Sequence, residues 1–92
     1  MAALEVAPAF GPGLNTLGEC LLAQDRPSEA LYAFQRAASV DPDVALRHLN
    51  VARVAARLDQ RPVACEALRQ FGAAGGSGPE ALELERSLRC TR

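Results

Sequence analysis

Short segments that interrupt secondary structure divide the sequence at nearly regular intervals. Each contains Pro or Gly beside polar residues, and the five segments lie at residues 8–13, 25–28, 41–43, 59–62 and 75–79. The stretches between them are roughly 11 to 15 residues long and rich in Ala, Leu and Arg, a composition that favours helix. This spacing predicts a series of short helices joined by tight connections.

Apolar residues recur with helical spacing between these interruptions. Leu14, Leu17, Gly18, Leu21 and Leu22 fall at positions i, i+3, i+4, i+7 and i+8. The pattern predicts helices at 13–24, 27–40, 44–58, 62–73 and 79–89, and a partial helix at 2–7. The sequence has no Ile and only 4% aromatic residues, which disfavours a β-sandwich. Short connections make successive helices antiparallel, and periodicity alone leaves a simple helical bundle open.

A pattern of residue size and spacing spans residues 14–42. Its members are Leu14, Leu17, Gly18, Leu21, Ala30, Phe34, Ala37 and Pro42. The pattern resembles the tetratricopeptide repeat, in which W-x2-L-G-x2-Y is followed by A-x3-F, A and P over 34 residues. Leu14 and Leu21 replace the aromatic residues of that pattern. The resemblance implies an all-α fold, a right-handed superhelical stack of antiparallel helix hairpins.

The residue types also have physical reasons. Gly18 and Ala30 are small, which suits a close crossing of the two helices in one hairpin. Phe34 is expected to fill the gap toward the next hairpin, and Pro42 to end the second helix.

A shift of 34 residues tests the repeat. Gly18 maps to Ala52, Ala30 to Ala64 and Phe34 to Leu68, so residue size is kept, whereas Leu14 maps to His48. We therefore divide the chain into the end of a preceding repeat (1–10), a repeat (11–44), a degenerate repeat (45–78) and a C-terminal capping helix (79–92). The sequence suggests a fragment or short member of a longer array, with self-association as the alternative.

The bulk composition predicts neither a nucleic-acid nor a membrane partner. The net charge is −1, and all ten basic residues are Arg. No apolar run is long enough to span a membrane. Cys20, Cys65 and Cys90 have no metal-type spacing and are expected to be small apolar fillers in a reducing compartment, so we expect a cytoplasmic location.

Little in the sequence indicates catalysis. His48 stands where the repeat has an aromatic residue, so we expect a half-buried packing residue rather than a metal ligand beside Cys20 and Cys65. Gly75–Gly78 is expected to be a connection, not a phosphate-binding loop. No Ser or Cys has a base at a recognisable spacing. We predict no enzyme activity, no metal and no cofactor.

The charges differ between the two repeats. Residues 11–44 have a net charge of −3, and residues 45–71 a net charge of +3. One interpretation is solvated surfaces with ion pairs between repeats, each contributing about 0–1 kcal/mol. The other follows from the family resemblance, since the first helix of each repeat then lines a concave groove. The predicted partner-binding residues are Asn15, Glu19, Leu49, Asn50, Arg53 and Arg57.

Arg53 and Arg57 would share one helical face, and the planar guanidinium suits a carboxylate. The predicted function is therefore a scaffold or adaptor that binds another protein in this groove, through an acidic or C-terminal peptide segment. Two alternatives are a small chaperone that masks an amphipathic partner helix and a non-catalytic repeat region of a larger enzyme.

Overall fold

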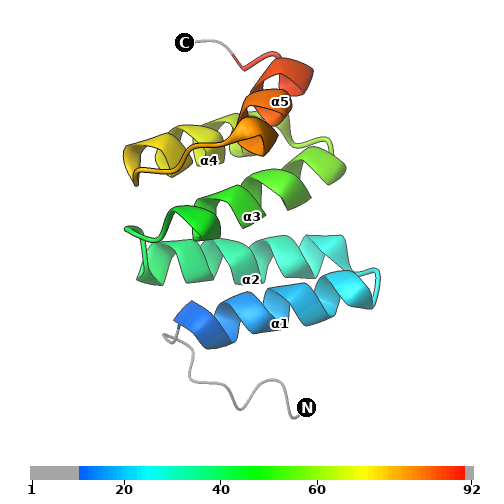
Figure 1. Cartoon of the computed structure of the whole chain (residues 1–92). Helices are drawn as coiled ribbons and strands as arrows, with labels where there is room; N and C mark the ends of the chain where they lie inside the picture. Colours follow the sequence, from blue (N-terminus) through cyan, green and yellow to red (C-terminus); the bar gives the residue numbers. More distant parts are fainter. Residues whose placement is uncertain (1–10, 91–92) are drawn as a thin grey trace.

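The helices lie one after another in a single stack (Figure 1). The computed structural model describes residues 11–90, with side chains from residue 13 onward. The five helices of this part are α1 (Gly11–Ala23), α2 (Pro27–Val40), α3 (Ala45–Arg57), α4 (Arg61–Ala73) and α5 (Pro79–Leu88). Residues 11–90 contain no strand, and the predicted all-α stack of helix hairpins is confirmed.

The observed helix ends lie within two residues of those predicted. The first turn of α1 begins at Gly11 because Pro12 fits the first turn of a helix, where its missing N–H costs no hydrogen bond. Pro27, Pro62 and Pro79 take the same first-turn positions in α2, α4 and α5. The helix predicted at 2–7, and the boundary of the preceding repeat at 1–10, lie outside the described residues.

The repeat period is visible in the backbone of the turns that end α1 and α3. Asp25 and Asp59 are 34 residues apart, and both adopt the left-handed conformation, with φ of 60° and 59°. The next N–H in each turn donates back to the helix, from Arg26 to the Leu21 carbonyl at 2.9 Å and from Gln60 to the Ala55 carbonyl at 2.8 Å. This is the Schellman arrangement, which satisfies carbonyls at the helix end. Both hairpins therefore turn in the same way.

Alanine dominates the core between the helices. The side chains with no exposed surface are Ala30, Ala37, Ala52, Ala55 and Ala64. Because these side chains are small, neighbouring helices can approach closely without leaving cavities. Val54 and Phe34, each 2% exposed, are the largest side chains among those almost fully buried.

Gly18 is small because the Phe34 ring lies directly on it. A Cβ atom built on Gly18 would approach a ring carbon of Phe34 to 2.7 Å, closer than real Cβ contacts. The ring also belongs to the core cluster that includes Leu49 and Ala52 of α3. Phe34 thus packs within its own hairpin as well as toward the next hairpin, which is more than the sequence predicted.

A disulfide joins Cys65 of α4 to Cys90, just after α5. The prediction that these cysteines are reduced fillers is therefore wrong, while Cys20 is free and exposed. Their separation of 25 residues gave no signal, since spacing alone does not reveal connectivity. Closing a loop of this size stabilises a fold by about 3 kcal/mol. The reducing compartment inferred from the cysteines loses its support, because disulfides persist mainly in oxidising environments or as redox sensors.

None of the helices between residues 11 and 90 has the length and apolar character needed to cross a membrane.

The contact between Gly18 and Phe34 predicts opposite effects for two Gly→Ala substitutions. Gly18→Ala should lower the free energy of unfolding by about 1–2 kcal/mol, because overpacking outweighs the gain in helix propensity. Gly72→Ala is the matched control, since a Cβ there meets nothing within 4 Å; it should be neutral or stabilising. Urea denaturation followed by circular dichroism would measure both. Equal effects of the two substitutions would contradict the proposed packing.

Candidate partner-binding face

Polar side chains from α1, α3 and α5 form a continuous row, which we call the polar ladder: Glu19, Asn15, Asn50, Arg53 and Glu80. Asn15 Nδ2 donates to Glu19 Oε2 at 3.5 Å, and Asn50 Nδ2 donates to Asn15 Oδ1 at 2.8 Å. Arg53 Nη1 donates to Asn50 Oδ1 at 2.8 Å. The ladder thus connects the first helices of both hairpins with α5, and it contains four of the six predicted binding residues.

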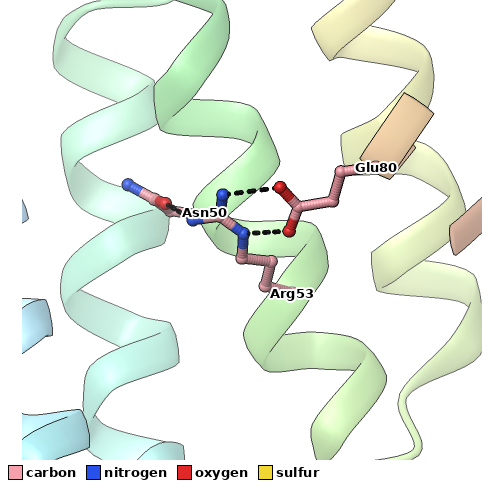
Figure 2. Close-up of polar contacts among 3 residues, drawn as sticks. All are labelled: Asn50, Arg53 and Glu80. Atoms are coloured by element: carbon pink, nitrogen blue, oxygen red, sulfur yellow. Dashed lines mark hydrogen bonds and ion pairs between the residues drawn. The ribbon is translucent and has the colours of Figure 1, made fainter. Parts of the chain in front are cut away.

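Arg53 holds both oxygens of the Glu80 carboxylate with one edge of its guanidinium (Figure 2). Arg53 Nε donates to one carboxylate oxygen at 2.6 Å and Nη2 to the other at 2.9 Å. Both side chains remain about half exposed. This bidentate geometry is the one in which Arg recognises carboxylates most specifically. The residue that the sequence identified as a carboxylate receptor therefore already binds a carboxylate of its own chain.

The titration of both partners reflects this contact. The hydrogen bond from Arg53 lowers the pKa of the Glu80 carboxyl, with a smaller contribution from the charge of Arg53. The hydrogen bond to Glu80 raises the pKa of Arg53. Glu80 also lies in the first turn of α5, where a negative charge complements the helix dipole.

Arg57 makes an ion pair between the two hairpins. Its Nη2 donates to Asp25 Oδ1 at 2.8 Å, and both side chains are exposed, Asp25 by 84%. Asp25 reaches this position because it occupies the left-handed turn after α1. Arg53 and Arg57 thus form ion pairs between structural units, which was one of the two interpretations that the charge pattern left open.

Leu49 does not belong to the exposed part of this face. It is only 7% exposed and packs in the hydrophobic core, so little of its side chain faces solvent, and its contact with a partner stays a prediction. Asn50 is also buried, with 6% exposed, and its amide is used inside the polar ladder. The accessible predicted residues are therefore Arg53, Arg57 and Glu19, with Asn15 partly exposed.

His48 is a packing residue that is more deeply buried than the half-buried position the sequence predicted. Its ring is 8% exposed, and Nε2 donates to the Pro42 carbonyl at 2.9 Å, which ties α3 to the preceding loop. A metal site with Cys65 is ruled out by the disulfide. Within the described part of the chain, no group of three His, Cys, Asp or Glu side chains could hold a metal ion.

An apolar hollow of about 420 Å³ lies over α2, α3 and α4 and was not found from the sequence. It is lined by Gln35, Ala38, His48, Val51, Pro62, Val63, Glu66 and Ala67. Its lining residues come from three helices, and none belongs to the polar ladder. The sequence gives no signal for this hollow, because it forms only where α2 and α4 pack on either side of α3.

The stacked antiparallel hairpins define an all-α helical-repeat protein. A family model described as tetratricopeptide repeat matches residues 12–44, which cover α1 from its second residue, α2 and the loop that follows. This segment is therefore similar to the tetratricopeptide repeat, in agreement with the resemblance seen in the sequence. The comparisons with curated proteins and with solved structures found no match. Tetratricopeptide repeats generally mediate protein–protein interaction.

The pKa shift of Glu80 predicts a pH dependence. Because the folded-state pKa lies below the ordinary value, the ion pair stabilises the fold at pH values above that ordinary pKa. The stabilisation is lost as pH falls through the folded-state pKa, below about pH 4. The loss should be at most about 1 kcal/mol, since the pair is exposed.

Glu80→Gln tests this dependence, because it removes the titrating group and keeps its shape. The difference in free energy of unfolding between the unmodified chain and Glu80→Gln should be present at pH 7 and shrink toward pH 3. Glu66, whose carboxyl pKa is also lowered by hydrogen bonds from Gln70 and Arg69, contributes equally to both proteins. A difference that does not change with pH would show that the pair adds no stability.

Proposed function

We propose that the chain is a non-catalytic adaptor whose α1–α3–α5 face binds an acidic peptide segment of another protein. The observation that carries the proposal is the bidentate contact between Arg53 and the Glu80 carboxylate. It supports a position at which a carboxylate can be held in the geometry that Arg prefers. A partner would present its own Asp, Glu or C-terminal carboxylate there.

Asn50 acts as a positioning residue in this proposal. Its Oδ1 accepts from Arg53 Nη1, and its Nδ2 donates to Asn15, so the side chain is fixed from both sides. Because the hydrogen bond from Arg53 Nη1 to Asn50 remains when Glu80 is displaced, the guanidinium is presented to the peptide with reduced freedom. Such preorganisation lowers the entropic cost of binding a carboxylate.

A second carboxylate of the peptide would meet Arg57. This guanidinium is one helical turn from Arg53, and its partner Asp25 is 84% exposed. An exposed pair contributes only about 0–1 kcal/mol, so an incoming acidic group can exchange with Asp25 at small cost. Two Arg residues at this spacing favour a run of acidic side chains over a single carboxylate.

A fluorescence anisotropy titration with a labelled synthetic peptide containing four consecutive Glu residues and a free C-terminus would test the function. The double substitution Arg53→Gln with Arg57→Gln should weaken binding about tenfold or more, the loss of at least one charge-assisted contact. Gln is preferred to Glu because it adds no repulsion with Glu80. Higher salt should also weaken binding.

Arg69→Gln is the matched control, since Arg69 is an exposed Arg of α4 that pairs with Glu66 on its own helix. It should bind the peptide like the unmodified chain. Equal affinity of the double variant, or equal binding of a peptide with Gln in place of Glu, would refute the proposed function. Binding of an uncharged amphipathic helix instead would favour a chaperone that masks such helices.

A further inference from the structure

Few contacts hold α5 on the rest of the molecule. Ala81 is its only buried residue in the described chain, while Leu84 and Leu88 are partly buried against the core. Leu82 is 58% exposed. A helix of ten residues is marginal on its own in water. The position of α5 therefore depends strongly on the two links at its ends.

The first link is the ion pair from Glu80 to Arg53, at the N-terminal end of α5. The preceding connection is hydrogen-bonded to α4 only at its start, where the Gly75 and Gly76 N–H groups donate to the Gly72 and Phe71 carbonyls. Gly78, just before α5, supplies no side-chain cap to the helix. Because both of its side chains are about half exposed, the ion pair is a weak attachment of the N-terminal end of α5.

The second link is the disulfide from Cys65 to Cys90, which closes the C-terminal end of α5 onto α4. Both half-cystines are partly exposed, so a reductant can approach them. Cys90 directly follows Arg89, which ends α5 in the left-handed conformation. The only covalent attachment of α5, apart from its main-chain connections, is therefore chemically reversible.

We propose that α5 is a redox-controlled cover of the Arg53 site, in which the disulfide keeps Glu80 on Arg53 and its reduction lets an acidic peptide take that place. This inference rests on the proposed function. A dithiol supplies the electrons: one thiolate attacks a sulfur of the Cys65–Cys90 bond and forms a mixed disulfide, and its second thiol resolves it. The protein disulfide takes up two electrons and two protons to give two thiols, and the dithiol becomes a disulfide.

Two measurements test whether the disulfide keeps α5 over Arg53. Both use the whole 92-residue chain with Cys20→Ser, which prevents cross-linking through the free cysteine. Hydrogen exchange of the α5 amides should accelerate up to about 100-fold on reduction with dithiothreitol, while α1 and α2 should keep their protection. The same reduction should tighten binding of the four-Glu peptide by about tenfold. A Cys65→Ser, Cys90→Ser variant should match the reduced protein and no longer respond to the reductant.

Glu80→Gln in the oxidised chain is a second route to the same state, because it vacates Arg53 without breaking the disulfide. It should tighten peptide binding, whereas Glu83→Gln, an exposed change on the same helix, should not. If reduction leaves hydrogen exchange of the α5 amides unchanged, α5 is not a redox-controlled cover. If reduction accelerates exchange of the α5 amides but does not tighten peptide binding, and the oxidised chain does bind the peptide, then the disulfide does not control binding. Faster exchange with no peptide binding in any form, Glu80→Gln included, would refute the proposed function and the cover's effect on it, and leave only the release of α5.

Discussion

The close approach of helices through alanine is the constraint on which the rest of the structure depends. Ala30, Ala52, Ala55 and Ala64 have no exposed surface, and larger side chains at these positions would separate the backbones. Since the helices are close, α1, α3 and α5 bring side chains from three different segments within hydrogen-bonding distance. The polar ladder is a consequence of this packing, because Asn15 and Asn50 could not meet across widely spaced helices.

Much of this fold could be predicted from the sequence, because the relevant signals are local. Pro and Gly mark the helix ends, and the turns at Asp25 and Asp59 repeat at the family period. The need for a small residue at Gly18 was predicted from size and spacing, although the Phe34 ring as its neighbour was not. The candidate face was predicted in part: the Arg residues were found through their helical spacing, but their partners were not, since Glu80 lies 27 residues from Arg53.

The contacts that the sequence did not reveal share one physical origin. Leu49 was assigned to the groove from the family pattern, yet it is 7% exposed and packs in the core, while Arg53, one turn further along α3, is about half exposed. The cysteine pair escaped notice because a disulfide depends on the distance between two helices, and no local pattern reports that distance. Each case concerns a contact between elements whose relative placement the sequence pattern does not specify.

The ion pair and the disulfide contribute to different properties of the same helix. A bidentate Arg–carboxylate contact gives chemical selectivity, but an exposed pair adds only about 0–1 kcal/mol and exchanges readily. A disulfide has no selectivity for the Arg53 site, yet it raises the effective concentration of the tethered Glu80 carboxylate by restricting how far α5 can move. A free peptide competes poorly with a carboxylate held in place at both ends of its helix. Because the selectivity lies in Arg53 and the restraint in Cys65 and Cys90, either property can change without loss of the other.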